Sequence, residues 1–333
     1  MAKISDVAQL AGVSPQTVSR TINYPDLVRP ETRATVEAAI RQLNYHPNNA
    51  ARTLATRRSK TIGLISTGVA AHTISKRMRA VDEAARSAGY QVSIANLDSA
   101  DRGQLLAALD VLLRQQIEGL VLIAADQDAL EAIHSIELDV PLVTAESSGR
   151  PDLHSVSIDQ FLGARLAVRH LVDLGHREIL HLSGPLRHLD AVERLRGWRA
   201  ELETHGLAVR EPLIGDWRAD SGYTAGIQLA DSLDCTAVFA GSDEMALGLL
   251  HAFRDRGIRV PEDLSVVGFD DLPGAAHFLP PLTTVRQDFD ELARGVIATL
   301  LAMMDGTEVA TPLHTEPELV VRESTRPLSL APS

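Results

Sequence analysis

Short apolar segments alternate with longer segments of mixed polarity through most of the chain after residue 60. The short segments are rich in Val, Ile and Leu, and the longer ones place their apolar residues at helical spacing. Strands that alternate with helices predict an α/β fold with parallel sheets covered on both faces. The predicted strands span residues 61–66, 91–96, 119–124 and 140–145, and then, as the pattern begins again, 155–159, 177–184, 236–243 and 264–271.

The two runs of this pattern share residues at one constant offset. Four pairs lie 117 residues apart: Ile62 and Ile179, Ser66 and Ser183, Gly89 and Gly206, and Asp126 and Asp243. This repetition predicts two similar α/β subdomains of the periplasmic-binding-protein type, side by side. A ligand is then expected in the cleft between them, beyond the carboxyl ends of the strands.

Helical spacing, not alternation, marks the beginning of the chain, where Val7, Ala8, Leu10 and Ala11 form one apolar stripe. Gly12 then suits the left-handed residue that ends a helix. Two residues later, Ser14 is a good N-cap and Pro15 fits the first helical position, so a second helix starts at once. Two helices joined by so short a turn predict a helix-turn-helix unit. A third helix, with Pro30 at its start and Val36, Ile40 and Leu43 as its stripe, completes a three-helix head.

The second helix carries side chains suited to DNA. Gln16 and Arg20 are four residues apart and share the face opposite Val18 and Ile22. Gln can bond adenine and Arg can bond guanine through paired hydrogen bonds in the major groove. The short polar side chains around them suit phosphate contacts; these are Ser14, Thr17, Ser19 and Asn23.

A short basic segment follows the head at residues 47–59. Asn48 can cap a short helix that carries Ala51 and Leu54, and a Leu exposed on such a helix can wedge into the minor groove. A helix this short is marginal alone in water, so it is expected to fold only against a partner. The alternative is an ordinary basic linker.

Charge separates the head from the rest of the chain. Residues 1–60 hold nine Lys and Arg and four Asp and Glu, a net charge of +5. Subtracting these from the chain totals of 32 and 44 leaves 23 basic and 40 acidic residues, a net charge of −17. Binding to a polyanion is therefore expected at the head alone.

The remaining composition excludes several classes of protein. No run of eighteen apolar residues and no secretory leader is found, so a cytoplasmic location is expected. Cys235 is the single cysteine and no Cys/His spacing suggests a metal site, so neither metal nor cofactor is expected. Nucleophile and phosphate-loop motifs are missing too, which argues against an enzyme, and His170, His176 and His181 are expected to be structural.

Polar and aromatic side chains follow several predicted strands, where a cleft ligand is expected. Carboxylates, an Arg and an amide around two aromatic rings suit a sugar, because planar polar groups bond paired hydroxyls and rings cover a pyranose face. Two members have a plainer interpretation: Asp243 as the cap of a helix, which we favour, and Phe289 as a core residue. Trp198, outside any cleft motif, is expected to pack a helix. The candidates are Thr73, Glu146, Arg194, Trp217, Asp243, Asp270, Gln287 and Phe289.

Several motifs together resemble the LacI/GalR family of transcriptional repressors, closest to its lactose-repressor branch, from residue 5 to about residue 323. They are DVAQLAGVSPQTVSRTIN, LNYHPNNAARTLATRRS, HLVDLGHREI, DEMALG, LSVVGFDD and PPLTTVRQDF, with GDW and RQDF pointing to the branch. The resemblance implies a homodimer that binds a pseudo-palindromic DNA operator and a small sugar effector that shifts it between two arrangements. It implies a DNA-binding domain at 1–46, a hinge helix at 47–59 and an effector-binding and dimerisation domain at 60–333. In that last domain, the N-subdomain spans about 60–158 and 287–316, and the C-subdomain about 159–286 and 317–328.

The resemblance also carries residue roles. Gln16 and Arg20 match base-reading positions, Pro15 stands where the lactose repressor has Tyr, and Leu54 and Ala51 match the hinge leucine that intercalates and its small neighbour. The chain ends without a leucine-heptad tail, so a dimer is expected.

In the cleft, family ligand positions are matched by Arg194, Trp217, Asp270, Gln287 and Phe289, whereas Glu146 replaces Asp and Ser242 replaces Asn. The expected effector is a β-galactoside or related disaccharide. A β-glucoside, or a purine that acts as co-repressor, is the alternative.

Overall fold

The computed structural model describes residues 2–45, 58–68, 72–97, 101–150, 152–310 and 312–328. The chain divides into two compact units, Met1–Ser59 and Lys60–Ser333. The predicted hinge residues Asn48, Ala51 and Leu54 lie outside the described residues.

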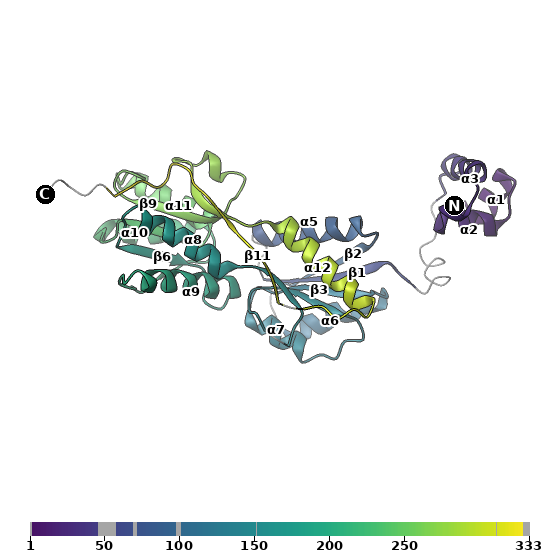
Figure 1. Ribbon diagram of the computed structural model, residues 1–333, viewed down its shortest axis with the longest axis horizontal. Helices are drawn as coiled ribbons and strands as arrows, with labels where there is room; N and C mark the ends of the chain where they lie inside the picture. Colours follow the sequence, from purple (N-terminus) through teal and green to yellow (C-terminus); the bar gives the residue numbers. More distant parts are fainter. Residues whose placement is uncertain are drawn as a thin grey trace. The chain divides into compact units, whose positions relative to one another are not determined.

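In the described part of the first unit, three short helices surround a small apolar core (Figure 1). Gly12 has a φ of 66° and ends the first helix, and the Ser14 hydroxyl accepts a hydrogen bond from the Thr17 amide at 3.1 Å to begin the second. Both predicted helix signals are thus present in the structure. Val7, Val18 and Val36 are fully buried where the helices meet. The elements are α1 (Ile4–Ala11), α2 (Pro15–Asn23), the 3-10 turn η1 (Pro25–Leu27) and α3 (Pro30–Gln42).

The second unit contains two six-stranded sheets whose strand orders correspond one to one. The first sheet has the order β11-β5-β4-β3-β1-β2 and the second β12-β10-β9-β8-β6-β7. Every pairing is parallel except that of β10 with β12. The first sheet contains β1 (Thr61–Thr67), β2 (Gln91–Leu97), β3 (Gly119–Ile123), β4 (Leu142–Ala145), β5 (Ser155–Ile158) and β11 (Leu313–Thr315). The second contains β6 (Ile179–Ser183), β7 (Leu213–Ile214), β8 (Ala237–Ala240), β9 (Ser265–Asp270), β10 (Thr283–Arg286) and β12 (Glu318–Val320).

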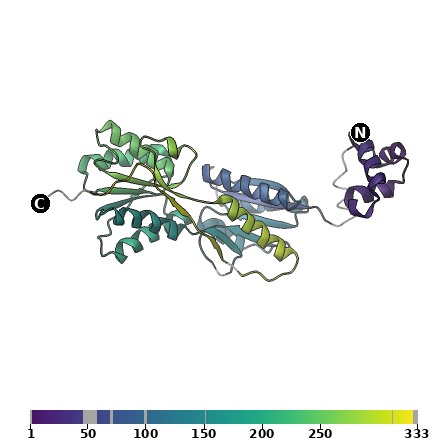
Figure 2. The ribbon, with the colours of Figure 1, turned by 45° about the horizontal axis from the view of Figure 1, so that its top comes forward.

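Helices cover both faces of each sheet, as the alternation predicts. In the view of Figure 2, α10 and α11 lie on one side of the second sheet, and α8 and α9 lie on the other. The first sheet is flanked by α5 (His72–Ser87) and α12 (Phe289–Met304) and by α6 (Arg102–Arg114) and α7 (Gln127–His134). The helices of the second are α8 (Gln160–Asp173), α9 (Leu189–Thr204), α10 (Ala219–Ser232) and α11 (Asp243–Asp255), with the short η2 (Ala275–His277) nearby.

One sequence expectation about the repeat is wrong. The segment around Ser155–Ile158 was expected to open the second run, but β5 pairs with β4 in the first sheet. The second run begins at β6 instead, and α5 and α9 are then offset by the same 117 residues at both ends. Three connections pass between the sheets: β5 to α8, β10 to α12, and β11 to β12. The last is the yellow segment that runs from one half to the other in Figure 1.

Two of the three histidines noted in the sequence contact the C-terminal segment, and the third packs in the core. His170 lies 2.9 Å from the Thr325 hydroxyl, and His176 contacts the Arg326 carbonyl oxygen at 3.2 Å. The fully buried His181 stacks on Phe239. These contacts support the structural roles expected of them.

The helices α10 and α11 approach each other through glycine. A Cβ on Gly248 would overlap the Ala219 carbonyl oxygen, and its distance to the Tyr223 amide nitrogen would be 2.5 Å. Backbone atoms cannot move aside as the end of a side chain can, so the two helices require glycine here.

Replacing Gly248 by Ala is therefore expected to lower the free energy of unfolding by about 1–3 kcal/mol or more, since it overpacks a helix contact. Gly295 in α12 is the matched control, because its added Cβ would meet only the Val156 side chain, at 3.1 Å. Urea unfolding compares the two variants. Equal midpoints for Gly248→Ala and Gly295→Ala would contradict this account of the contact.

Candidate functional site

A cavity lies between the two halves of the second unit, at the carboxyl ends of their strands. The space free of atoms in the cavity and at its mouth is about 770 Å³, which includes open solvent. Both halves contribute lining residues, so an occupant that fills the cavity contacts both. Its lining residues are Gly68, Thr73, Ile74, Arg77, Ile123, Ala124, Ala125, His188, Asp190, Arg194, Trp217, Ser242, Glu244, Asp270 and Leu272.

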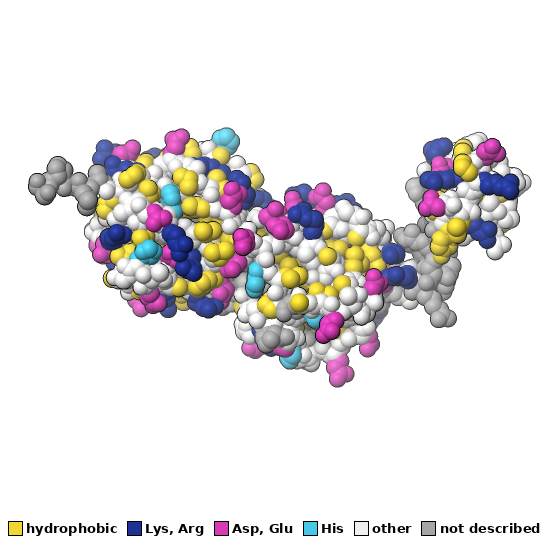
Figure 3. All heavy atoms as spheres, in the orientation of Figure 1, with side chains coloured by type: hydrophobic (Ala, Val, Ile, Leu, Met, Phe, Trp, Pro, Cys, Tyr) yellow, Lys and Arg dark blue, Asp and Glu magenta, His cyan; other side chains and the backbone are white. Residues whose placement is uncertain are grey.

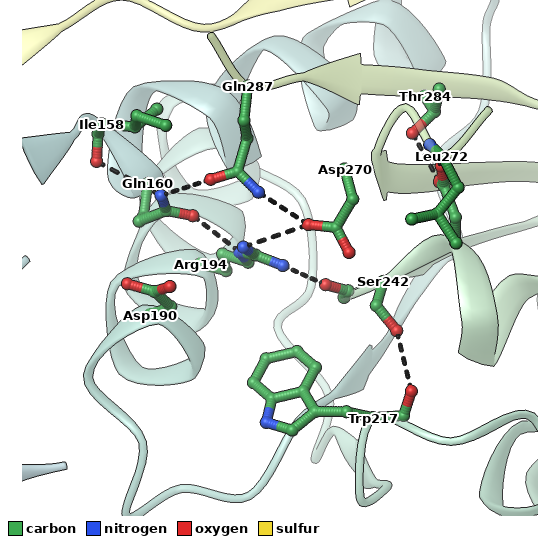
Figure 4. A network of polar contacts seen from close by, with 12 residues as sticks. Ile158, Gln160, Asp190, Arg194, Trp217, Ser242, Asp270, Leu272, Thr284 and Gln287 are labelled. Carbon is green, nitrogen blue, oxygen red and sulfur yellow. Dashed lines mark hydrogen bonds and ion pairs between the residues drawn. The ribbon is translucent and has the colours of Figure 1, made fainter. Parts of the chain in front are cut away.

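Arg194, on α9, is the centre of a buried polar network in this cavity (Figure 4). Its Nε donates to the Gln160 side-chain oxygen at 2.8 Å, and one Nη donates to the Gly241 carbonyl oxygen. The other Nη lies 3.5 Å from an Asp270 oxygen, which also accepts from Gln287 at 2.7 Å. Gln160 and Gln287 bond each other at 2.9 Å. Two of the connections between the sheets are thereby tied to the same guanidinium.

The aromatic wall of the cavity is Trp217, which follows β7. Its indole nitrogen donates to His188 Nδ1 at 2.8 Å. His188 Nδ1 must therefore be unprotonated, because only an unprotonated ring nitrogen accepts a hydrogen bond. Burial lowers the pKa of His188 and so favours this neutral form. The guanidinium carbon of Arg194 lies 5.4 Å from the centre of the Trp217 ring. Gly184 has no side chain where the ring lies, and a Cβ there would overlap it.

Two cavity residues other than glycine have left-handed backbone conformations. Trp217 has a φ of 75° and Asp270 a φ of 115°. Such conformations cost about 1–3 kcal/mol each and persist only where surrounding contacts impose them. Their presence at this cavity supports a functional interpretation of it.

Asp243 does not cap α11, contrary to the interpretation we favoured from the sequence. Ser242 is the N-cap, because its hydroxyl accepts from the Met245 amide at 3.2 Å. Asp243 is fully buried in the first turn, where it accepts from the Leu272 amide at 2.8 Å and the Thr284 hydroxyl at 2.5 Å. Burial and the nearby Asp270 raise the pKa of Asp243 to about 8.

This raised pKa predicts a pH-dependent stability. Between about pH 4 and pH 8 the folded protein keeps the Asp243 proton, whereas the unfolded chain has lost it. The contribution of this proton to the free energy of unfolding is therefore complete below about pH 4 and is lost as pH rises towards 8. The free energy of unfolding should fall by up to about 1.4 kcal/mol per pH unit in this range because of Asp243. Asp243→Asn, whose side chain resembles the protonated form, is expected to lack this part of the slope. Urea unfolding between pH 5 and 9 measures it, and parallel curves for the two proteins would rule it out.

The structure brings some of the predicted effector residues together and leaves others aside. Thr73, Arg194, Trp217, Ser242 and Asp270 line the cavity. Gln287 does not line the cavity but donates a hydrogen bond to Asp270, which does. The Glu146 carboxylate instead accepts from the Ser148 amide and bonds the Thr144 hydroxyl, and Phe289 belongs to the buried core of the first sheet.

Sequence reasoning missed Arg77, Asp190, His188 and Glu244 as lining residues. Two of them carried a usable signal. Arg77 lies 117 residues before Arg194, so the internal repeat places it at the equivalent position of α5. Asp190 lies four residues before Arg194 and shares its face of α9.

The head presents the side chains predicted to face DNA. Gln16 and Arg20 are exposed on α2, whereas Val18 is buried against the other helices. Ser14 and Pro15 are exposed, and Thr17 and Ser19 are half-buried on the same helix. The side chain of Asn23 lies outside what the structure describes. Figure 3 shows Lys and Arg side chains on the visible face of this unit.

Two other features are absent from the described residues. In the part of the chain that the structure describes, no group of three or more His, Cys, Asp or Glu is placed to hold a metal ion. Likewise, none of the described helices is both long and apolar enough to cross a membrane.

Comparison with known proteins agrees with both units. Residues 3–48 match the model of bacterial regulatory proteins of the lacI family, and residues 168–325 match the periplasmic binding protein-like domain. The chain is 37% identical to the lactose operon repressor of Escherichia coli K12, over 96% of its own length and 89% of that protein. It is 36% identical to the HTH-type transcriptional repressor PurR of Proteus mirabilis, over 97% of both chains.

Solved structures agree with these relatives. A crystal structure of the lac repressor dimer bound to operator and the anti-inducer ONPF has a TM-score of 0.86 and 35% identity, with 98% of this chain and 99% of that chain covered. A complex of the transcriptional regulator CelR with cellobiose has a TM-score of 0.73 and 35% identity, with coverage of 97% and 100%. Because the head, the two-sheet unit and nearly the whole length all match, this chain belongs to the lacI family and is a DNA-binding transcriptional repressor.

Proposed function

We propose that this repressor binds a pseudo-palindromic operator as a homodimer, and that a small sugar in the cavity lowers its affinity for that operator. The effector we favour is a β-galactoside or a related disaccharide. The observation that carries this proposal is a cavity lined by both halves, with carboxylates and guanidinium groups beside an indole ring.

The chemistry of the cavity suits sugar hydroxyls. Each hydroxyl both donates and accepts, so it can bond a carboxylate and a guanidinium at once. Asp190 and Asp270 offer acceptors, Arg77 and Arg194 offer donors, and Trp217 offers an apolar face for a pyranose ring. A planar purine needs donors and acceptors in one plane and makes less use of acidic and basic groups on several sides.

The route from effector to operator needs only a difference in affinity. Because the cavity is formed by both halves, a ligand favours the arrangement of the halves that it fits best. If that arrangement differs from the one that binds operator, effector and operator weaken each other by the same factor.

The alternative effector is a β-glucoside, and one finding favours it. CelR, which covers this chain almost completely at 35% identity, was solved with cellobiose. The likeness to PurR, at 36% identity, likewise keeps a purine co-repressor among the candidates to be tested.

Calorimetric titration of the full-length protein with lactose, allolactose, galactose, cellobiose and hypoxanthine tests the proposal. We expect one disaccharide to bind most tightly, and Trp217→Ala to abolish that binding. Trp217→Phe is the matched control, since it keeps an aromatic face and loses the hydrogen bond to His188. Exclusive binding of hypoxanthine, or normal binding by Trp217→Ala, would refute the sugar site.

A further inference from the structure

One ion pair inside the cavity joins the two halves of the second unit. An Arg77 Nη on α5 donates to an Asp190 oxygen on α9 at 2.7 Å. The other Asp190 oxygen accepts from the Ser147 hydroxyl at 2.8 Å, and Ser147 follows β4 of the first sheet. Both partners of Asp190 thus come from the half of the unit opposite its own.

Asp190 is the most accessible acid of the cavity's two ion pairs. Its side chain keeps 22% of its surface exposed, against 7% for Asp270 and 4% for Arg194. Burial raises the pKa of Asp190, but Arg77 and Arg194 outweigh this effect and bring it to about 2. The carboxylate is therefore ionised at neutral pH and can only accept hydrogen bonds, which suits the hydroxyl donors of a ligand.

Arg77 contributes an unused donor. Its Nε is buried and has no hydrogen-bond partner among the residues that the structure describes. A buried donor without an acceptor costs free energy, and a ligand oxygen that meets the guanidinium restores what is lost. Arg77 lines the cavity, so a ligand bound there meets this side chain and its guanidinium.

The internal repeat accounts for the two arginines of these pairs. Arg77 and Arg194 lie at equivalent positions of α5 and α9, and each lies beside a carboxylate, Asp190 or Asp270. The cavity thus carries a guanidinium and a carboxylate twice, once across the halves and once within the second half. A ligand with hydroxyl groups on more than one side makes use of both.

We propose that Arg77 and Asp190 are specificity-determining residues of the effector site, where they bind hydroxyl groups that the Arg194 and Asp270 pair does not reach. This inference rests on the proposed function, namely that the cavity takes a sugar. According to this inference, Arg77 and Asp190 determine which of several sugars binds best when the sugars differ in hydroxyl position, as lactose and cellobiose do.

Calorimetric titration of full-length Asp190→Asn, Arg77→Met and the double variant with lactose, allolactose and cellobiose tests the assignment. Each single variant is expected to bind the preferred sugar about 10- to 100-fold more weakly and to change the ratio of lactose to cellobiose affinity. The double variant should lose less than the product of the single losses, because the two side chains contact each other.

The control is Glu201→Gln. Glu201 is also a buried, ion-paired acid on α9, but it pairs with Arg165 and Arg169 of α8. This variant is expected to lose stability in urea and to keep the sugar affinity and the affinity ratio of the unmodified protein.

Four outcomes would overturn the inference. Single variants that bind within about twofold of the unmodified protein, or that weaken every sugar equally, would overturn it and leave the proposed function standing. So would a Glu201→Gln variant with the same loss of sugar affinity. If the unmodified protein binds none of the sugars, both this inference and the proposed function fail.

Discussion

Replacing Arg194 by Ala is expected to lower the free energy of unfolding by about 3–5 kcal/mol at neutral pH. The change removes the bonds to Gln160 and Gly241 and leaves the buried Asp270 carboxylate without its nearest cation. It also removes the guanidinium that lies 3.7 Å from the centre of the Phe269 ring. We expect the variant to lose its response to sugar as well.

The decrease in the free energy of unfolding caused by Arg194→Ala should become larger as the pH rises. Burial raises the pKa of Asp270 to about 6, and Arg194 and Arg77 oppose that rise. Without Arg194, folded Asp270 keeps its proton to a higher pH, so the folded state is penalised more as the unfolded chain ionises. Urea unfolding at pH 5 and pH 8 should therefore show the larger difference from the unmodified protein at pH 8.

Arg196→Ala is the matched control for this experiment. Arg196 lies two residues further along α9, and it is exposed and pairs with Glu193. Exposed pairs contribute about 0–1 kcal/mol. Similar losses for Arg194→Ala and Arg196→Ala would contradict the central position given to Arg194.

Gln16→Ala and Arg20→Ala are each expected to cost about 1–3 kcal/mol of binding free energy at the cognate operator and little on random DNA. Both side chains are exposed on the same face of α2, where they can reach base edges in the major groove. Anisotropy titrations with operator and with random duplex at one salt concentration measure the difference.

The control for the head is Arg33→Ala, because Arg33 is held by Glu37 on α3 at 2.8 Å. It is expected to change operator and random binding alike, if at all. If Gln16→Ala and Arg20→Ala weaken both duplexes equally, these side chains contact phosphates instead of bases.

Local signals predicted the head correctly. Gly12, Ser14 and Pro15 act through their own backbone and near neighbours, and each has the role expected of it. The alternation of strands and helices likewise predicted two parallel α/β halves. Sheet membership depends on distant partners, which is why β5 was placed in the wrong run. The short edge strands β11 and β12 were not predicted. Each has three residues, which are too few to show a pattern of alternating apolar and polar positions.

The site was predicted in part, for a similar reason. Asp270, which ends a predicted strand, could be placed at the cleft from the strand pattern alone. Trp217 follows a two-residue strand that the pattern did not predict, and its GDW motif placed it there instead. Arg77 and Asp190 lie on helices and reach the cavity only because the two halves meet there. Glu146 does follow a strand, but its carboxylate is taken by the nearby Ser148 amide. No local rule shows which of several possible donors a carboxylate meets.

Operator affinity with and without sugar tests the central claim most directly. We would measure fluorescence anisotropy of the full-length protein on a symmetric lactose-type operator at fixed salt, with lactose, allolactose, galactose, cellobiose or hypoxanthine added in turn. The account predicts that one disaccharide weakens operator binding. It is contradicted if only hypoxanthine acts, if the effective compound tightens the complex, or if no compound changes the affinity.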